Sequence, residues 1–462
     1  MPGALMTDLY ELTMAAGYLR HGMTGQATFS LFARRLPPTR GFLVAAGLSD
    51  CLDFLEGLSF TDEELSYLAE VHGLHGLDGM RFTGEVWAVP EGRVVYANEP
   101  LLEVTAPIAE AQVVETMLLN HVTFQTSVAG KAARCVLAAD GADLVDFAFR
   151  RTQGVDAAMA VARATAIAGF AATSNVEAAR RYRLRATGTM AHSYIEAFAD
   201  EATAFETFAT DYPDRTVFLV DTYDTLEGVR AAIDVTRRLH LPGQVGVRLD
   251  SGDLATLSKQ ARALLDAHGL TSARVVASGG LDEHRIADLV RQGAPIDAYG
   301  VGTKVGVSAD APSLDSAYKL VEYDGRPVMK LSPGKATAPG RKQVFRGPSG
   351  DVLGLRTEPA PADHEALLIP VMRGGRRLTP PEPLPAARDR CAADLAALPE
   401  AVRCLDAPAA PAVRLSKPLA DLAGQVRDAL ERRLGDATPP ADPPDDGMPS
   451  TGEPRERYSA QQ

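Results

Sequence analysis

One histidine in this chain lies in a setting that suits chemistry. His192 stands in the segment Ala186–Phe198 (ATGTMAHSYIEAF), between a run of arginines and a stretch with a helical pattern. Imidazole titrates near neutral pH, and its neutral form is a good nucleophile. Small residues on both sides of His192 leave room for a ligand to approach it. A buried or capping histidine is the ordinary alternative, so the rest of the chain must decide between the two.

Six short apolar segments that read as strands all end in polar residues or glycines. The six ends are Asp146–Gln153, Thr189–His192, Asp221–Asp224, Arg248–Asp253, Ser278–Gly280 and Gly300–Lys304. Active sites of α/β barrels lie at the carboxyl ends of the strands. Turns alone need such residues only at scattered positions. Their presence at every strand end therefore predicts an enzyme whose site lies along this edge.

The side chains at these ends have complementary chemistry. Gly279-Gly280 and Gly302-Thr303 are expected to open helices, whose backbone N–H groups can bind a phosphate. Arg248 and Asp250 alternate at one strand end and could hold a charged group and sugar hydroxyls. Five of the eight lysines fall between Lys304 and Lys342, where phosphate binding is one use for a compact charge and a solvated surface is the other. No P-loop is present, and no G-x-G-x-x-G motif follows a strand.

Two further pairs suggest binding and catalysis. Phe147 with Arg150 offers an aromatic face beside a guanidinium that can clamp a carboxylate. Asp221 could orient His192 and stabilise its positive charge, as a carboxylate does in a catalytic triad. The alternative role for Asp221 or Asp224 is that of a helix N-cap.

The elements that position these residues fall into four parts. Residues 1–125 read as α+β, and residues 126–325 alternate short strands, including Ala186–Thr189, with helical stretches. Repeated βα units without a switch point predict a closed parallel barrel, with a doubly wound open sheet as the alternative. Residues 326–434 return to strand-like pieces followed by two helices. Residues 435–462 are rich in Pro and Asp, which predicts a disordered tail.

Composition argues against several classes of protein. The net charge of -13 and the lack of a basic stripe argue against nucleic-acid binding. No apolar run approaches the ~20 residues of a transmembrane helix, and the first residues lack the pattern of a secretory signal. The four cysteines are far apart, which argues against a zinc or disulfide framework and for a reducing cytoplasm.

Taken together, these features resemble those of nicotinate phosphoribosyltransferase. The likeness runs from the segment Thr7–Met14 (TDLYELTM) to about Leu434. Further matching pieces are Phe124–Arg134 (FQTSVAGKAAR), Thr173–Val176 (TSNV), Tyr318–Val321 (YKLV) and Met329–Ser332 (MKLS). Members of this family form nicotinate mononucleotide and pyrophosphate from nicotinate and phosphoribosyl pyrophosphate, with ATP hydrolysis coupled to turnover. The reaction is the first step of NAD salvage from nicotinate.

The resemblance implies a fold, an assembly and cofactors. The expected fold is an irregular α/β barrel beside an α/β sandwich domain built from both chain ends. The expected assembly is a cytoplasmic homodimer with active sites shared at the interface. ATP and Mg²⁺ are the implied cofactors, with Mg²⁺ held mainly by the substrate phosphates rather than by a dedicated protein site.

The resemblance also implies catalytic roles for single residues. His192 matches the transiently phosphorylated histidine, and Asp221 matches the acid next to it. Arg248 and Asp250 match residues around the ribose and the diphosphate. The residues matched to the 5′-phosphate site are Gly279, Gly280, Gly302 and Thr303, with Lys319 as a further phosphate contact.

The resemblance also implies which residues bind the pyridine ring. Phe147 matches the ring that stacks on the pyridine, Arg150 matches the substrate-site arginine, and Tyr10 would stack from the partner subunit. Nicotinamide-using relatives place an aspartate where this chain has Ser174, and Ser174 beside Asn175 therefore favours the acid over the amide. Two alternatives are quinolinate phosphoribosyltransferase, which needs a more basic pocket, and a non-enzymatic sensor of pyridine or phosphoribosyl ligands.

Overall fold

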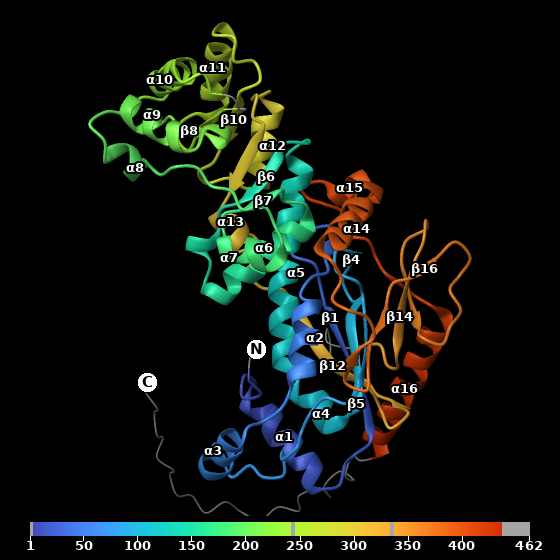
Figure 1. Ribbon diagram of the computed structural model, residues 1–462. Helices are drawn as coiled ribbons and strands as arrows, with labels where there is room; N and C mark the ends of the chain where they lie inside the picture. Colours follow the sequence, from blue (N-terminus) through green and yellow to red (C-terminus); the bar gives the residue numbers. More distant parts are fainter. Residues whose placement is uncertain (1–2, 242–244, 333–336, 437–462) are drawn as a thin grey trace, which may run out of the picture.

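Two lobes joined by one long helix make up the molecule (Figure 1). The computed structural model describes residues 3–241, 245–332 and 337–436. The first and the last described segments of the chain lie together in the lower lobe of Figure 1, which we call the sandwich lobe. The middle of the chain forms the upper lobe, which we call the half-barrel lobe.

A seven-stranded antiparallel sheet forms the centre of the sandwich lobe. Its strand order is β13-β12-β1-β5-β3-β17-β18. The strands are β1 (Gln26–Ala33), β3 (Glu85–Ala88), β5 (Pro100–Pro107), β12 (Ser316–Tyr323), β13 (Arg326–Pro327), β17 (Ile369–Arg373) and β18 (Arg376–Arg377). Strands from the first and last thirds of the chain are neighbours in this order, so the sheet is built from both chain ends. β12 lies within residues 126–325, which were predicted to form the barrel, so that boundary is wrong by about ten residues. β1 has partners on both sides, and every residue in it after Gln26 is buried.

Smaller elements complete the sandwich lobe. A four-stranded sheet contains β14 (Lys342–Arg346), β15 (Val352–Leu355), β16 (Glu365–Ala366) and β19 (Arg414–Leu415), and β2 (Leu43–Val44) pairs with β4 (Val94–Val95). The helices are α1 (Leu9–Arg20), α2 (Leu48–Gly57), α3 (Asp62–His72), α4 (Ile108–Val113) and α16 (Lys417–Asp436). α14 (Leu384–Ala397) and α15 (Glu400–Arg403) come from the same part of the chain but pack buried side chains, among them Cys391 and Val402, into the core of the half-barrel lobe. α14 and α16 confirm the two helices that the sequence predicts near the end of the chain. The core between these layers contains Leu31, Val104 and Val344.

Six parallel strands form the sheet of the half-barrel lobe, in the order β7-β6-β11-β10-β9-β8. The strands are β6 (Asp143–Asp146), β7 (Ala172–Thr173), β8 (Val217–Leu219), β9 (Gly246–Leu249), β10 (Arg274–Ala277) and β11 (Ala298–Val301). The accompanying helices are α6 (Val155–Ala168), α7 (Val176–Tyr182), α8 (His192–Glu196), α9 (Glu201–Asp211), α10 (Thr225–Arg238), α11 (Leu254–Ala267), α12 (Glu283–Arg291) and α13 (Thr303–Gly306), with 3₁₀ turns at Phe149–Arg151 and Pro213–Arg215.

The prediction of a closed barrel is not met, because the sheet is an open half-barrel. β7 and β8 are its two edges, and no pairing joins them within the described residues. The segment Ala186–Thr189, predicted as a strand, makes one isolated bridge, between Ala186 and Thr173. This segment (ATGT) contains a glycine and no apolar β-branched residue, so it lacks the side chains that stabilise a strand in a buried sheet. The chain instead passes through α7, α8 and α9 on its way from β7 to β8.

Helix α5 (Glu115–Ala138) joins the two lobes. Its first half packs into the core of the sandwich lobe through Met117, Leu118 and Val122. Its second half packs into the core of the half-barrel lobe, where small residues such as Ala129 and Ala132 are completely buried. With 24 residues the helix is about 36 Å long, so one element contributes side chains to both hydrophobic cores.

Two predictions concern residues that lie wholly or mostly outside the described ranges. The tail predicted at 435–462 lies outside the described residues except for its first two positions, which end α16. Lys335, one of the clustered lysines, also lies outside them. Within the described part of the chain, no helix is long and apolar enough to span a bilayer.

Candidate active site

The carboxyl ends of the parallel strands meet along one edge of the half-barrel sheet. The register places Leu219 of β8 beside Arg248 of β9, and Val301 of β11 beside Asp146 of β6. Successive side chains of a strand point to opposite faces. Val247 and Leu249 are buried in the core, so Arg248 between them projects to the other face of the sheet.

Arg248 connects side chains from several strand ends. Its guanidinium donates to Asp250 Oδ1, Ser278 Oγ and Thr189 Oγ1, each at 2.8 Å. The same group lies over the Phe147 ring, 5.5 Å from the ring centroid. A planar guanidinium with fixed donors holds such partners in one geometry. Arg248 therefore sets the relative positions of four segments around the site.

Asp250 is held in its ionised form by this arrangement. Burial acts to raise the pKa of Asp250, but hydrogen bonds from Arg248 and Ser278 and the charges of Arg248 and His192 outweigh it, leaving the pKa below its ordinary value. A carboxylate with a lowered pKa keeps its charge through the neutral range. A fixed negative charge thus lies close to His192.

His192 is the first residue of α8 and is partly exposed. Its Nδ1 lies 3.1 Å from Thr222 Oγ1. Asp221 faces a different partner: its Oδ2 accepts hydrogen bonds from Asp250 N at 3.0 Å and from Ser251 Oγ at 2.6 Å. Its Oδ1 is buried and has no hydrogen-bond partner within the described residues. Thr222, rather than Asp221, therefore makes the hydrogen bond that orients the imidazole.

The Phe147 ring lies directly against the backbone of β11. A Cβ added at Gly300 would lie 2.5 Å from two ring carbons of Phe147 and 3.2 Å from Ser278 Cβ. Only glycine at position 300 leaves room for the ring in this position. Arg150 is exposed on the 3₁₀ turn that follows β6. Phe147 and Arg150 thus lie on the same strand end, with the ring against the sheet and the arginine open to solvent.

The glycine loops after β10 and β11 surround the same edge. Gly279 has φ +89°, and a Cβ on it would lie 1.9 Å from Asp250 O. Gly280 has φ +65° and open space around it. Gly302 occupies the N-cap position of the four-residue helix α13. The prediction that Gly279 and Gly280 open a helix is wrong, because α12 begins at Glu283.

Aspartates, rather than glycines, begin three of these helices. Asp224 accepts hydrogen bonds from the N–H groups of the first turn of α10, and Asp253 does the same for α11. Asp282 caps α12 through Arg285 N. An oxygen-bearing cap is worth about 1 kcal/mol to a helix. The N-cap interpretation is thus correct for Asp224 and does not apply to Asp221.

Three family models match the chain in order. The model of the nicotinate phosphoribosyltransferase N-terminal domain matches residues 5–123, the model of the nicotinate phosphoribosyltransferase family matches residues 142–346, and the model of its C-terminal domain matches residues 341–423. The chain belongs to the nicotinate phosphoribosyltransferase family.

Several similar proteins are named as nicotinate phosphoribosyltransferases. Nicotinate phosphoribosyltransferase pncB2 of Mycobacterium tuberculosis H37Rv is 50% identical over 87% of this chain and 89% of its own. The nicotinate phosphoribosyltransferase of Bacillus subtilis is 47% identical over 74% of this chain and 73% of its own. The crystal structure of human nicotinic acid phosphoribosyltransferase superposes with a TM-score of 0.81 at 29% identity, covering 91% of this chain and 99% of that one.

Two residues matched to nicotinate phosphoribosyltransferases by resemblance lie in the sandwich lobe. Tyr10 is on α1 and is 47% exposed. Lys319 is on β12, opposite Ser30 of β1, and is partly buried. Figure 1 shows α1 at the opposite end of the molecule from α8, which begins with His192. The structure therefore does not bring Tyr10 to the strand ends of its own half-barrel.

Two residues at the end of β7 were predicted to favour nicotinate over nicotinamide. Ser174 is partly exposed, and its N–H donates to Asp146 O at 2.8 Å. Asn175 is fully buried, and its side-chain oxygen caps α7 through Ala178 N at 3.1 Å. Ser174 is thus available to a ligand, whereas Asn175 is used by the fold.

Three residues at this site were not predicted to have a role. Thr189 and Thr222 lie within the predicted strand ends, but a threonine has no charge that would distinguish it as a binding residue. Glu201, the first residue of α9, has its pKa raised to about 7 by burial and by the negative charges of Asp221 and Asp224. Its Oε1 is buried without a hydrogen-bond partner within the described residues. No local pattern could have shown that Glu201 lies near Asp221.

Proposed function

We propose that this protein forms nicotinate mononucleotide and pyrophosphate from nicotinate and phosphoribosyl pyrophosphate. Family membership over most of the chain supports the reaction class. The observation that carries the proposal is the group of strand-end residues around Arg248, because it joins an aromatic face, a fixed carboxylate and glycine loops along one edge. The product would enter NAD synthesis.

The pyridine is proposed to bind at Phe147. The ring is held against Gly300, and Arg248 lies over its face, so the aromatic surface and a positive charge are adjacent. Arg150, which is exposed at the same strand end, can donate a charge-assisted hydrogen bond to a pyridine carboxylate while the pyridine stacks on Phe147. Ser174 at the neighbouring strand end provides a neutral donor. These contacts support nicotinate over nicotinamide as the preferred base.

The ribosyl donor is proposed to lie along the glycine loops. Gly280 has open space around it and Gly302 is the N-cap residue of α13, so a phosphate could approach the backbone N–H groups of these loops. The C1–O bond to the diphosphate breaks as the pyridine nitrogen forms its bond to C1, and pyrophosphate leaves with the electron pair. Charge that develops on the leaving group needs fixed positive charges nearby. Arg248, held by Asp250 and Ser278, supplies one of them.

ATP coupling is proposed to pass through His192. Nδ1 contacts Thr222, so Nε2 is the nitrogen that the described residues leave free. The γ-phosphoryl group of ATP would bond to this nitrogen as its bond to the ADP oxygen breaks, and water would later release phosphate. Asp250 and Asp221 Oδ1 are hard oxygen donors that suit Mg²⁺. The described residues contain no group of three or more His, Cys, Asp or Glu side chains placed to hold a metal, so Mg²⁺ would be held chiefly by substrate phosphates.

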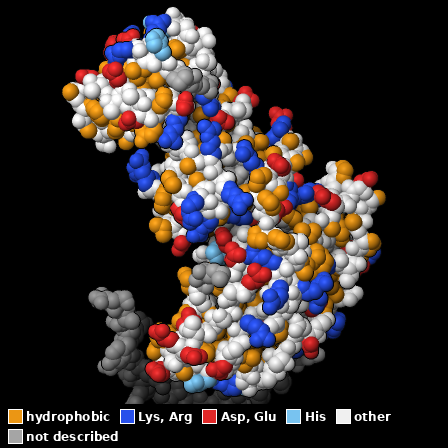
Figure 2. Space-filling model, viewed as in Figure 1, with side chains coloured by type: hydrophobic (Ala, Val, Ile, Leu, Met, Phe, Trp, Pro, Cys, Tyr) orange, Lys and Arg blue, Asp and Glu red, His pale blue; other side chains and the backbone are white. Residues whose placement is uncertain are grey.

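A homodimer with shared active sites is proposed from the exposed apolar residues. Met6, Leu9, Tyr10 and Met14 are all exposed at α1, and Phe149, Val155 and Val176 are exposed near the active-site edge. Exposed apolar patches of this kind mark interfaces. Figure 2 shows Lys and Arg side chains gathered over α7 and acidic side chains over α3. An antiparallel pair of subunits would bring these opposite charges together and place the partner's Tyr10 at the site.

One assay tests the proposed reaction. The purified protein is incubated with nicotinate, phosphoribosyl pyrophosphate and Mg²⁺, with and without ATP, and pyrophosphate and nicotinate mononucleotide are measured. We expect both products in equal amounts, with a faster rate when ATP is present. Ligand-induced thermal stabilisation without product would instead identify a sensor.

The four free thiols support a cytoplasmic location as part of this proposal.

A further inference from the structure

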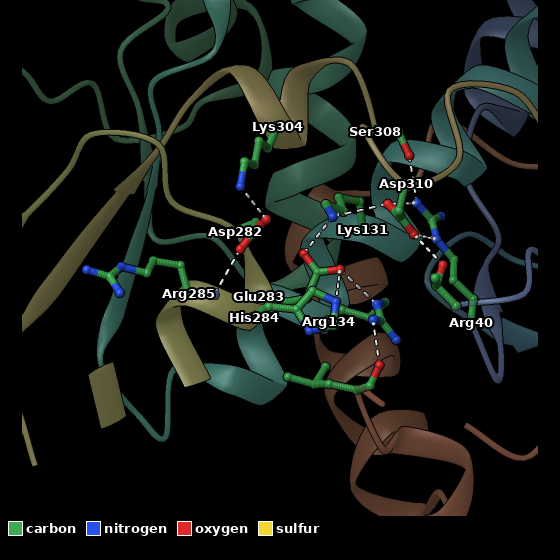
Figure 3. A network of polar contacts seen from close by, with 12 residues as sticks. Arg40, Lys131, Arg134, Asp282, Glu283, His284, Arg285, Lys304, Ser308 and Asp310 are labelled. Carbon is green, nitrogen blue, oxygen red and sulfur yellow. Dashed lines mark hydrogen bonds and ion pairs between the residues drawn. The ribbon is translucent and has the colours of Figure 1, made fainter. Parts of the chain in front are cut away.

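An ion pair links the two glycine loops at the active-site edge. Lys304 Nζ lies 2.7 Å from Asp282 Oδ2. The other oxygen of Asp282 accepts the hydrogen bond from Arg285 N, at 2.9 Å, that caps α12 (Figure 3). One carboxylate therefore both begins a helix and holds a lysine from the loop after the next strand of the sheet.

The position of this pair follows from the sheet topology. β10 and β11 are parallel neighbours, and Ala277 lies beside Tyr299. Asp282 follows Gly280 by two residues, and Lys304 follows Gly302 by two residues. The pair thus spans the edge between the two loops. The Asp282 side chain is 13% exposed, whereas the Lys304 side chain is 45% exposed, so it is the lysine that a ligand can reach.

Behind the pair lies a buried cluster of charges, which we call the α5 charge cluster: Arg40, Lys131, Arg134, Glu283 and Asp310 (Figure 3). Lys131 Nζ lies 2.6 Å from Glu283 and 3.1 Å from Asp310. Arg134 Nε lies 3.0 Å from Glu283, and Arg40 Nε lies 2.9 Å from Asp310. Glu283 is the residue after Asp282, so these ion pairs fix the beginning of α12 against α5.

The α5 charge cluster carries an excess of positive charge. Its three cations against two anions leave one net positive charge, and the Lys304–Asp282 pair adds none. Buried charges are screened less by salt than exposed ones. A buried ion cluster is weak evidence for stability, because desolvation costs offset the attraction. Fixing the start of α12 and favouring an anion at the adjacent loops explains the cluster better.

The arrangement around Asp282 favours its ionised form. Burial acts to raise its pKa, but the hydrogen bonds from Lys304 and from Arg285 N, together with the charges of Lys304 and Lys131, outweigh burial and leave the pKa below its ordinary value. The charge of Lys131 contributes to this lowering of the pKa, so the field of the α5 charge cluster reaches the loop. Lys304 is thus restrained by a permanent negative charge on a fixed helix start.

We propose that Lys304 binds the 5′-phosphate of the ribosyl donor and that Asp282 is the positioning residue that holds Lys304 for this contact. The inference rests on the proposed function, which places the donor along the glycine loops. A lysine ammonium suits a phosphate as a point charge. With Asp282 attached, the side chain gives up less rotational freedom when the phosphate arrives.

Substitutions of Lys304 and Asp282 distinguish phosphate binding from a purely stabilising ion pair. Lys304→Met removes the charge and keeps the apolar stem, and Lys304→Arg keeps the charge. Asp282→Asn keeps a good helix cap but removes the charge that restrains the lysine. Lys259→Met is the matched control, because Lys259 is on α11 and its Nζ donates to Gln292 O away from the glycine loops.

The measurements are steady-state kinetics and binding of ribose 5-phosphate by calorimetry. In Lys304→Met we expect KM for phosphoribosyl pyrophosphate to rise about tenfold or more, since a hydrogen bond between two charged groups is lost. KM for nicotinate and kcat should change by less than about twofold, because the contact is remote from the pyridine and the breaking bond. Lys304→Arg should recover most of the loss, and Asp282→Asn should show a smaller rise of the same kind. Ribose 5-phosphate should bind more weakly in the same order of variants.

Several results would overturn the inference. An unchanged KM for the donor in Lys304→Met, with a lowered melting temperature, would make the pair a structural tie only. Failure of Lys304→Arg to recover binding would exclude a charge contact. If Lys304→Met does not fold, Asp282→Asn decides by its donor KM alone. Parent protein that makes no nicotinate mononucleotide would refute the proposed function, whereas active parent protein with unaltered variants refutes only this inference.

Discussion

Gly300→Ala should damage nicotinate binding without unfolding the protein. The added Cβ would lie 2.5 Å from two ring carbons of Phe147, whereas ordinary contacts between carbon atoms are about 3.5–4.0 Å. The ring must therefore move by about 1 Å. The backbone of β11 lies on one side of the ring, so the ring moves towards the open face of the site, where the pyridine is proposed to stack.

The magnitude follows from the cost of overpacking, which is about 1–3 kcal/mol when the neighbours are fixed. Because Phe147 is partly exposed, the ring can move, and the cost falls mainly on the stacked complex rather than on stability. We expect KM for nicotinate to rise about tenfold, which corresponds to about 1.4 kcal/mol. KM for phosphoribosyl pyrophosphate should change little.

The assay is steady-state kinetics with nicotinate varied at saturating donor and ATP. Gly424→Ala is the control, since Gly424 is on α16 and a Cβ there meets nothing within 4 Å. In a Phe147→Ala background, Gly300→Ala should have little further effect, because the side chain it displaces is absent. An additive loss in the double variant, or an unchanged KM in the single one, would refute the stacking role of Phe147.

Three further predictions concern the charge and the chemistry of the site. His192→Ala should abolish ATP hydrolysis and leave slow ATP-independent transfer, and intact ATPase activity would exclude the phosphohistidine. Nicotinate should exceed nicotinamide by a large factor in kcat/KM, because Ser174 replaces the acid that accepts from an amide; equal values would contradict this. The pKa of Glu201 is raised from 4.5 to about 7, so the folded state holds this proton more tightly and stability should fall as pH rises through that window. Glu201→Gln should remove about 1 kcal/mol of that loss, after allowance for solvent screening, and denaturation at pH 5 and pH 8 measures it. Glu11, whose pKa is also raised to about 7, keeps a similar pH dependence in both proteins.

Local pattern was enough to find five of the six strands of the half-barrel, but not the two-residue edge strand β7 (Ala172–Thr173), which is too short to show a period. The apolar run Arg274–Ser278 reads as a strand from its sequence alone, and β10 covers Arg274–Ala277. The segment Leu254–His268 has a helical pattern in its sequence, and α11 covers it up to Ala267. Both segments combine a clear apolar period with a polar or capping residue at the boundary, and this information is local.

Closure of the sheet and the ion pairs depended on information that is not local. Ala186–Thr189 was read as a strand from its position between βα units, although its residues have little tendency to form one. Arg40 and Asp310 are 270 residues apart and their contact leaves no periodic signal in the sequence. Asn175 was considered for base choice, but its use as a buried cap depends on its backbone position at the start of α7.

The hydrogen bonds of the site indicate what each substrate must supply. Arg248, Asp250 and Ser278 satisfy one another, so they form a fixed wall. His192 Nε2 and Asp221 Oδ1 are left without partners within the described residues. A buried carboxylate oxygen without a donor is costly, so a ligand that brings a hydroxyl group or a cation to Asp221 gains affinity from it. A ribosyl donor with its bound Mg²⁺ can bring both, and a phosphoryl group can occupy Nε2, which accounts for a site that is complete only when the proposed substrates are bound.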